Sequence, residues 1–441
     1  NNQWGLSTPS KEQFNCKQFI DKGIGYGMKT EQVDGNDIQK VYECINRVKQ
    51  SQKKNPEPFL VEALTFRMRG HEEASGTKYY PDGLQDKWKK KDPILKLETE
   101  ATKENHFSTK EIQEKKAELK NKINKAWLKA YSAAPLKADL NTELEDIYKS
   151  HNSENSITYE NKKEMRFIDA ISQGLFQGME KFDNSIIMGQ DIAEYGGVFK
   201  VTDGFLNKFG KDRVRNTPLC ESAIVGAALG LSLKKKKAIM EMQFADFVTV
   251  GFNQIVNNLA KLHYRWGQNA DVVIRMPTGA GVGAGPFHSQ SNEAWFFHTP
   301  GLKIIYPSNP EDAKGLMIAA MEDPNPIMIF EHKALYRSIT GEVPENYYVT
   351  PIGKAKLIQQ GQDLSIITYG MGVHWAEEAV NKNNLSADIL DLRTLLPLDK
   401  EAIFETVKKT NRVLILHEDS LTGGIGGELS SLINENCFEF L

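Results

Sequence analysis

The feature that most constrains this chain is a repeated alternation of short apolar segments with longer segments of helical periodicity, which begins near residue 165. Strands that alternate with helices in this way are typical of a largely parallel sheet covered by helices on both faces. The strands expected in this part are residues 185–189, 214–219, 238–242, 272–276, 302–306 and 326–330. The helices expected between them are residues 167–181, 222–233, about 246–266, and 310–321.

A smaller unit of the same kind is expected from about residue 351, after a connection over residues 335–348 that contains Pro344. Its expected strands are residues 364–369, 388–392 and 413–417, and its expected helices are residues 373–381, 400–410 and 426–434. The sequence therefore predicts two consecutive α/β units in the rear part of the chain.

The front of the chain also combines strands and helices. Asp37 follows Gly35 and precedes a helical pattern that runs to about residue 52, so it is the expected N-cap. The remaining expectations are a buried strand over residues 58–67, a long polar loop over 71–92, a surface helix over 110–129 and a polar linker over 136–164.

Composition excludes several classes of protein. The 441 residues favour about three domains, at roughly 150 residues each. A net charge of −3 gives no basis for a nucleic-acid or acidic-membrane partner, and no apolar run approaches the ~20 residues of a membrane span. The cysteines form no metal-type pair, so we expect the reduced thiols of a cytoplasmic protein; they are Cys16, Cys44, Cys220 and Cys437.

Two local features bear on what the chain can be. Residues 279–285 (GAGVGAG) lack the G-x-G-x-x-G spacing, and Pro286 follows them in place of a helix start, so nicotinamide binding is not expected there.

The chain begins with Asn1-Asn-Gln-Trp-Gly5, which resembles the end of a strand, and it stops near an expected helix end. We therefore expect a fragment that lacks both ends of the full protein.

An ordered set of short motifs runs along nearly the whole chain, and on these motifs it resembles one family. They are Asn1-Asn2, Val33-Asp-Gly-Asn-Asp37, Arg67-Met-Arg-Gly-His71, Tyr195-Gly-Gly-Val-Phe199, Asn216-Thr-Pro-Leu-Cys-Glu221, Gln243-Phe-Ala-Asp-Phe247, His288-Ser-Gln-Ser291, Pro300-Gly-Leu-Lys303, Leu335-Tyr-Arg337 and Asp391-Leu-Arg-Thr394. The chain resembles the thiamine-diphosphate-dependent dehydrogenase component of 2-oxo-acid dehydrogenase complexes, with its alpha and beta parts fused. The motifs that end at Glu221, Ser291 and Arg337 resemble the branched-chain (3-methyl-2-oxobutanoate) type more than the pyruvate type.

The resemblance implies an α/β protein with the thiamine-diphosphate-binding fold, in which parallel sheets carry helices on both faces, plus a transketolase C-terminal-like α/β domain. Residues 1–140 would be the rear half of the diphosphate-binding domain, 141–162 a linker, 163–345 the pyrimidine-binding domain, and 346–441 an incomplete C-terminal domain. The implied reaction is oxidative decarboxylation of a branched-chain 2-oxo acid, with acyl transfer to the lipoyl group of a partner acyltransferase. The implied cofactors are thiamine diphosphate and Mg²⁺, and the implied assembly is a homodimer of fused chains.

The same resemblance assigns roles to individual residues. The family's glutamate that hydrogen-bonds the pyrimidine nitrogen N1′ falls on Glu221, and an aromatic residue that stacks on the aminopyrimidine falls on Phe247. His288 matches the histidine for proton handling and acyl transfer, a task that suits a group titrating near neutrality. His71 matches a histidine beside the diphosphate and the incoming lipoyl arm.

The metal site and one departure complete the assignment. Asn2 and the main-chain carbonyl of Trp4 match two Mg²⁺ ligands, and oxygen ligands with phosphate oxygens suit that ion. The third family ligand belongs to a Gly-Asp-Gly motif that this chain does not contain. Gln190 stands where the family usually has glutamate, so a proton-relay role at that position is in doubt.

Three alternatives remain open on the sequence. The first is the same reaction on pyruvate or acetoin. The second is a non-catalytic fragment or scaffold that lacks half of the cofactor site. The third is transketolase-like sugar chemistry, against which the His288-Ser-Gln-Ser291 and Asp391-Leu-Arg-Thr394 motifs argue.

Overall fold

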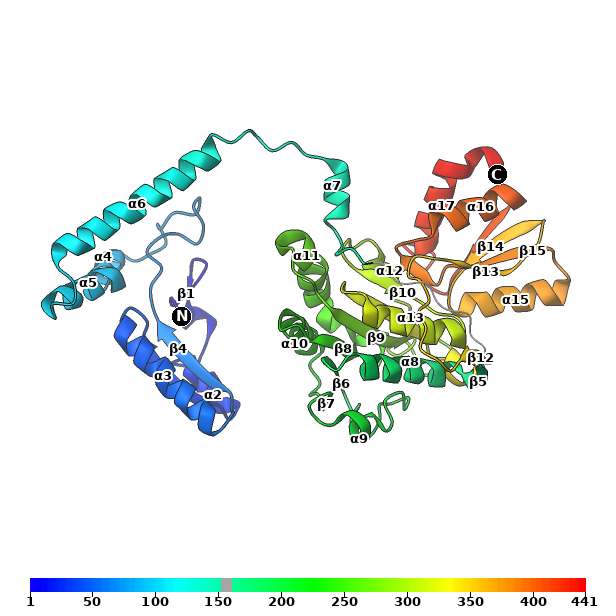
Figure 1. Cartoon of the computed structure of the whole chain (residues 1–441), viewed down its shortest axis with the longest axis horizontal. Coiled ribbons are helices and arrows are strands. Elements are labelled where there is room, and N and C mark those ends of the chain that lie inside the picture. Colours follow the sequence, from blue (N-terminus) through cyan, green and yellow to red (C-terminus); the bar gives the residue numbers. More distant parts are fainter. Residues whose placement is uncertain (152–160) are drawn as a thin grey trace. The chain divides into compact units, whose positions relative to one another are not determined.

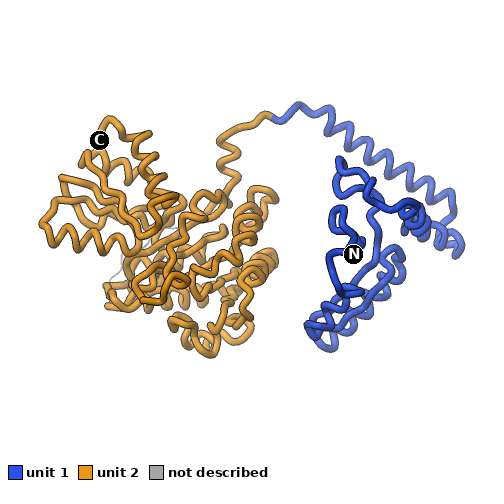
Figure 2. The backbone as a smooth tube through the Cα atoms, turned by 180° about the vertical axis from the view of Figure 1, so that it is seen from behind, with its two compact units in different colours: residues 1–136 blue, residues 137–441 orange. Residues whose placement is uncertain are grey.

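The computed structural model describes residues 1–151 and 161–441, and the chain divides into two compact units, residues 1–136 and 137–441 (Figure 2). Each unit is described by itself. Part of the predicted linker, residues 152–160, lies outside the described residues. All four cysteines carry free thiols. Within the two described ranges, none of the helices combines the length and the apolar character that a membrane crossing requires.

Unit 1 is built around a parallel pair of strands, β3 and β4, with helices beside it. Its elements are β1 (Trp4–Gly5), β2 (Thr8–Pro9), α1 (Ser10–Gln13), α2 (Ile20–Gly25), β3 (Lys29–Asp34), α3 (Ile38–Lys54), β4 (Phe59–Leu64), α4 (Leu84–Lys89), α5 (Pro93–Lys103) and α6 (Thr109–Tyr131). The predicted N-cap is confirmed, because the Asp37 carboxylate accepts a hydrogen bond from the Lys40 amide at 3.0 Å.

The predicted loop over residues 71–92 is only partly a loop, because α4 lies inside it. Trp88 of α4 stacks on Phe66 with ring centroids 5.4 Å apart, and Tyr80 packs against the same phenylalanine at 4.9 Å. This aromatic packing stabilises a short helix that the polar composition of the segment does not reveal. The predicted surface helix is confirmed as α6, which begins with a capping box between Ser108 and Glu111.

Unit 2 contains a seven-stranded sheet in the order β16-β10-β11-β9-β8-β6-β7, parallel except for β16. Its strands are β6 (Ser185–Gly189), β7 (Val214–Asn216), β8 (Lys237–Glu241), β9 (Val272–Thr278), β10 (Lys303–Ile305), β11 (Ile327–His332) and β16 (Thr394–Leu396). The helices of this part are α7 (Leu140–Glu145), α8 (Phe167–Lys181), α9 (Phe205–Phe209), α10 (Glu221–Leu233), α11 (Ala260–Trp266), α12 (Ala294–Phe297) and α13 (Pro310–Glu322). The predicted parallel sheet is confirmed.

The two faces of this sheet are covered by different helices. Figure 1 shows α8 and α13 side by side, and they pack closely together over one face. Successive residues of a strand point to opposite faces, so Ile239 joins the core under α8 and α13 whereas Ala238 and Met240 join the core under α10. Such strands are buried on both faces, which explains their nearly continuous apolar sequences.

The predicted long helix over residues 246–266 is wrong as a single regular helix. The segment consists of a 3-10 helix, η1 (Ala245–Gly251), a π-helical stretch, η2 (Gln254–Leu259), and the α-helix α11. Val248, Thr249 and Val250 precede Gly251, and both β-branched residues and glycine have low helix propensity. Stretches of 3-10 and π geometry occur often at functional sites.

The connection predicted over residues 335–348 is also more regular than expected. It contains α14 (Leu335–Ser338) and β12 (Thr340–Pro344), and β12 pairs antiparallel with β5 (Lys162–Arg166). The segment beyond it forms a second sheet in the order β13-β15-β14-β17. Its elements are β13 (Lys356–Gln359), β14 (Leu364–Thr368), α15 (Met371–Asn383), β15 (Ala387–Asp391), α16 (Lys400–Thr410), β17 (Val413–Leu416), α17 (Ile425–Cys437) and η3 (Phe438–Phe440).

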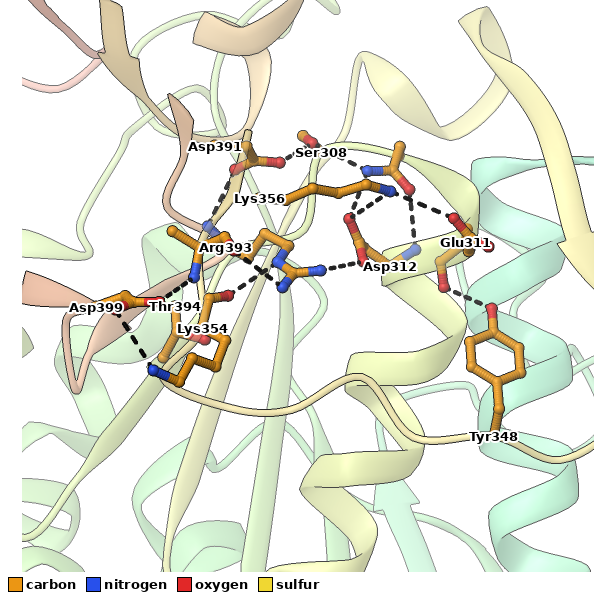
Figure 3. A network of polar contacts seen from close by, with 12 residues as sticks. Ser308, Glu311, Asp312, Tyr348, Lys354, Lys356, Asp391, Arg393, Thr394 and Asp399 are labelled. Carbon is orange, nitrogen blue, oxygen red and sulfur yellow. Dashed lines mark hydrogen bonds and ion pairs between the residues drawn. The ribbon is translucent and has the colours of Figure 1, made fainter. Parts of the chain in front are cut away.

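The Asp391-Leu-Arg-Thr394 motif forms the joint between the two sheets of unit 2 (Figure 3). Asp391 ends β15, Thr394 begins β16 of the larger sheet, and the Ser308 hydroxyl donates a hydrogen bond to Asp391. The Arg393 guanidinium donates to Asp312 of α13 at 2.9 Å, and the Arg393 amide donates to Asp391 at 3.0 Å. Burial raises the pKa of Asp391 to about 7.

Candidate active site

Four neighbouring parallel strands bring most of the candidate residues of unit 2 to one edge of the seven-stranded sheet. The strands β9, β8, β6 and β7 are adjacent in that order. Gln190 follows β6, Glu221 follows β7, Phe247 follows β8 and His288 follows β9. Ligands of open α/β sheets bind at the carboxyl ends of the strands, so this edge is the expected site.

Glu221 is the first residue of α10 and is partly buried. The Gln190 side-chain amide donates a hydrogen bond to Glu221 Oε1 at 3.1 Å. Among the residues that the structure describes, no other side chain binds this carboxylate, so its second oxygen is available to a ligand. The first turn of a helix also favours a negative charge, because the helix dipole is positive there.

Phe247 lies on η1 and forms an edge-to-face contact with the ring of His288, with centroids 5.6 Å apart. Phe244 contacts the same histidine at 4.9 Å. The helix η1 packs against α10, where a β-carbon at Gly251 would lie 3.8 Å from the Glu221 carbonyl oxygen. The structure therefore brings Phe247 and His288 into direct contact, and η1 connects this pair to the start of α10, where Glu221 lies.

The glycine-rich loop over residues 279–285 is held at its base by three hydrogen bonds. The Gly279 amide donates to the Gln290 carbonyl at 3.0 Å, the Ala280 amide donates to Glu418 at 2.8 Å, and Lys333 donates to the Gly279 carbonyl at 2.6 Å. Gly279 has a φ of 80°, and a β-carbon there would lie 2.2 Å from His332, so the position requires glycine. This fixed base orients the segment that carries His288.

Asp246 connects η1 to the segment after that loop, and sequence reasoning missed it. Its Oδ1 accepts a hydrogen bond from the Gln290 amide at 3.1 Å, and the neighbouring Ala245 carbonyl accepts one from Asn292 at 2.9 Å. Asp246 lies inside the motif that ends at Phe247, but nothing in the sequence distinguishes it from a first-turn acid of a helix. Its role in holding Phe247 against His288 depends on a tertiary contact.

A buried ion-pair network lies in the sheet beneath this edge. The guanidinium of Arg275 on β9 is fully buried between Glu241 of β8 and Glu331 of β11, and the Tyr336 hydroxyl donates to Glu331 at 2.6 Å. Burial raises the pKa of the Glu241 carboxyl. The network ties three strands together directly behind the loops that carry the candidate residues.

A cavity of about 400 Å³ opens beside the glycine-rich loop. Its lining includes Ala280, Ser289, Gln290, Trp295, Glu418 and Asp419.

The nearby Glu293 is fully buried, and the Tyr369 hydroxyl donates to it at 3.0 Å. Burial raises the pKa of Glu293 to about 8, so this carboxyl is mostly protonated at neutral pH. The sequence offered no signal for Glu293, because its burial arises from the packing of the two sheets.

The remaining candidates lie in unit 1. Asn2 is partly buried, and its side-chain oxygen accepts a hydrogen bond from the Trp4 amide at 3.0 Å. The Trp4 ring packs against Tyr79 and Tyr80, with centroids 5.8 and 5.0 Å away. These contacts fix the backbone turn that carries Asn2 and the Trp4 carbonyl.

His71 is exposed and lies at the start of a loop. Its Nδ1 is 3.5 Å from the guanidinium of Arg67, which also donates to the Tyr79 hydroxyl at 2.9 Å and to the Leu6 carbonyl at 2.6 Å. Because Tyr79 also packs on Trp4, the structure places His71 near the turn that carries Asn2.

The residues present fit an aminopyrimidine cofactor in two respects. The available oxygen of Glu221 can meet a ring nitrogen, and Phe247 presents an aromatic ring at the same edge. For a metal, Asn2 and the Trp4 carbonyl provide only two oxygen ligands. Within residues 1–151 and 161–441 no cluster of three His, Cys, Asp or Glu side chains is placed to hold an ion. An ion at Asn2 would therefore need further oxygens, such as those of a phosphate.

Three family models match the chain in consecutive segments. Residues 1–139 match the dehydrogenase E1 component, residues 163–338 the transketolase pyrimidine binding domain, and residues 353–441 the transketolase C-terminal domain.

Curated relatives match over about three fifths of the chain. The 2-oxoisovalerate dehydrogenase subunit beta of Bacillus subtilis (strain 168) is 46% identical over 278 residues, which are 62% of this chain and 85% of that protein. The mitochondrial 2-oxoisovalerate dehydrogenase subunit beta of Dictyostelium discoideum is 44% identical over 63% of this chain and 76% of that protein. The pyruvate dehydrogenase E1 component subunit beta of Acholeplasma laidlawii is 41% identical over 62% of this chain and 84% of that protein.

Among solved structures, a split-gene transketolase, described as an inactive beta4 tetramer, matches with a TM-score of 0.51 and 20% sequence identity. The match covers 61% of this chain and 84% of that one. At this identity the likeness supports the fold alone, and it agrees with the predicted α/β architecture.

Proposed function

Since this chain belongs to the family of thiamine-diphosphate-dependent 2-oxo-acid dehydrogenase E1 components, we propose that it oxidatively decarboxylates a branched-chain 2-oxo acid and passes the acyl group to the lipoyl group of a partner acyltransferase. The high identity to 2-oxoisovalerate dehydrogenase beta subunits supports the branched-chain substrate. A pyruvate dehydrogenase beta subunit is nearly as similar, so pyruvate is the second candidate substrate.

The observation that carries the proposal is the position of Glu221. It begins α10 at the carboxyl edge of the sheet, Gln190 binds one of its oxygens, and the other oxygen is available to a ring nitrogen. Thiamine diphosphate supplies a nucleophilic carbon that adds to the keto group and stabilises the charge left when CO₂ departs. The contribution of Glu221 is to hold a proton at the pyrimidine nitrogen N1′, which activates the cofactor.

Phe247 and His288 have complementary roles in this proposal. Phe247 packs against the pyrimidine and excludes water from it, while its contact with His288 keeps that imidazole at the same edge. His288 moves a proton to or from the reacting substrate and assists acyl transfer, since an imidazole can both donate and accept a proton. His71, which is exposed beside Arg67, guides the lipoyl group toward the diphosphate.

We propose that the Mg²⁺ site lies in unit 1. Asn2 Oδ1 and the carbonyl oxygen of Trp4 would hold Mg²⁺, which would need further oxygens such as those of a bound diphosphate. Two copies of the fused chain associate as a homodimer, because the family forms each active site between an alpha part and a beta part. Light scattering that gives a single-chain mass at all concentrations would contradict the dimer.

The experiment that tests the function compares turnover of 3-methyl-2-oxobutanoate and pyruvate by the purified protein with thiamine diphosphate and Mg²⁺. We expect a higher kcat/KM for the branched-chain acid, measured first with an artificial electron acceptor and then by acylation of a lipoyl domain. A higher kcat/KM for pyruvate would contradict the proposed substrate but not the proposed reaction. Turnover without lipoyl acylation would contradict the proposed transfer.

A further inference from the structure

The buried side chain of Gln190 contacts Glu221 directly. Its Nε2 donates to Glu221 Oε1 at 3.1 Å, and its own Oε1 is buried without a hydrogen-bond partner among the residues that the structure describes. The side chain is 5% exposed, so its unpaired carbonyl oxygen carries a desolvation cost.

The backbone on both sides of Gln190 is fixed. Gly189 ends β6, and Asp191 has a φ of 58°, a left-handed conformation that turns the chain sharply after the strand. The Asp191 carbonyl accepts from the Gly197 amide at 2.9 Å, and its carboxylate accepts from Gln243 at 3.4 Å. Gln190 therefore reaches Glu221 from a rigid position.

A side-chain amide has a donor at one end and an acceptor at the other. It can donate Nε2 to Glu221 when that group is an ionised carboxylate. The same Nε2–H can still donate to Glu221 Oε1 when the other oxygen of Glu221 carries a proton, because the carbonyl oxygen of a carboxylic acid also accepts a hydrogen bond. An ionised carboxylate at position 190 has no hydrogen to donate to Glu221, and two carboxyl groups that share a site raise the pKa of one of them.

We propose that Gln190 is a positioning residue that holds Glu221 in one orientation in both of its protonation states. The amide occupies Oε1 of Glu221 throughout, so the other oxygen stays directed at the site while it gains or loses a proton. The inference rests on the proposed function, because it assumes that Glu221 exchanges a proton with a bound ring nitrogen.

The other acids around this pair already have partners. Glu194, in the loop after β6, accepts from Asn216 at 2.8 Å, and Glu241 at the end of β8 is paired with Arg275. Asp246 on η1 accepts from the Gln290 amide. The carboxylate of Asp191 is bound by Gln243. These contacts leave Gln190 as the described side chain that binds Glu221.

The test compares Gln190→Met, which keeps the size but removes both polar ends, with Gln190→Glu, which keeps the shape but adds a carboxyl. Gln190→Met should lower kcat about tenfold to a hundredfold, as expected for loss of one hydrogen bond to a charged group, with KM little changed. Gln190→Glu should move the acid limb of the kcat–pH profile upward, because the two carboxyls titrate as a coupled pair.

Two readouts other than activity complete the experiment. Calorimetry with thiamine diphosphate and Mg²⁺ should give similar affinities for the wild type and Gln190→Met. The circular-dichroism band of the bound cofactor's imino tautomer should titrate over a different pH range in Gln190→Glu. An unchanged kcat and unchanged pH profile in both variants would overturn the role of Gln190, and so would a uniform loss of cofactor affinity. A wild-type protein that turns over no 2-oxo acid would instead overturn the proposed function itself.

Discussion

Asp391 lies at the joint between the two sheets of unit 2, and Glu221 lies at the carboxyl edge of the larger sheet. At the joint, Ser308 and the Arg393 amide bind the buried Asp391 carboxyl, and the Arg393 guanidinium binds Asp312 close by. At the edge, a single amide binds a partly exposed carboxylate. The comparison shows two uses of a carboxyl group. A buried carboxyl with several partners stabilises the contact between the two sheets, whereas a partly exposed carboxylate with one partner remains available to bind a ligand.

The largest effect is expected at the edge. Glu221→Gln should lower kcat by about 10²–10⁴-fold, the range for loss of a proton-transferring group, and should leave the urea midpoint near that of the wild type. Glu194→Gln is the matched control, because Glu194 is an exposed carboxylate in the neighbouring loop and should retain nearly full kcat. If Glu221→Gln kept the wild-type kcat, Glu221 would not be needed for catalysis, and the edge would no longer differ from the joint in function.

The joint should respond in the opposite way, through stability. Arg393→Met leaves Asp312 without its guanidinium partner in a buried setting, which should destabilise unit 2 by about 3 kcal/mol. Urea unfolding followed by tryptophan fluorescence measures this change. If Arg393→Met unfolds at the same urea concentration as the wild type, the stability of the joint does not depend on the ion pair between Arg393 and Asp312.

The pH dependence of stability distinguishes the regions further. Burial raises the pKa of Asp391 to about 7 in the folded protein, against about 3.9 for an unfolded aspartate. As pH rises from about 4 to about 7, the unfolded chain loses this proton first, so the contribution of Asp391 to stability falls across that window and is constant above it. Asp391→Asn should therefore show a weaker decline in urea midpoint between pH 4 and 7. An identical pH dependence in wild type and variant would contradict the raised pKa.

The smallest effect is expected for the exposed cation of the same joint. Lys356 is 3.3 Å from Glu311 and is partly exposed, so Lys356→Met should cost less than about 1 kcal/mol. This loss should shrink in high salt, unlike that of Arg393→Met. A cost equal to that of Arg393→Met would mean that the joint depends on net charge more than on buried geometry.

Much of the fold of unit 2 could be predicted from the sequence, because its strands are buried on both faces. The apolar runs that became β6 and β9, and the periodicity that became α8, leave little choice of structure. Glu221, Phe247 and His288 were proposed from motifs, and the strand order explains why they share an edge.

The sequence could not predict features that depend on tertiary contacts. The helical pattern over residues 246–266 hid a 3-10 and a π-helical stretch, because periodicity does not report where the hydrogen-bond ladder changes. The helix α4 is stabilised by the stacking of Trp88 on Phe66, which lie far apart in the sequence. The contact between Gln190 and Glu221 joins the residue after β6 to the first residue of α10, so the sequence alone indicated only that Gln190 departs from the family pattern.

The irregular helix has a further consequence at Gly301, which lies in the Pro300-Gly-Leu-Lys303 motif. A β-carbon at Gly301 would lie 1.8 Å from the carbonyl oxygen of Ala260, the residue where η2 passes into α11. The missing side chain at position 301 therefore lets the backbone of the Pro300-Gly-Leu-Lys303 motif lie directly against the first turn of α11. Any side chain at position 301 would separate these two segments, so this close contact between distant parts of the chain depends on one glycine.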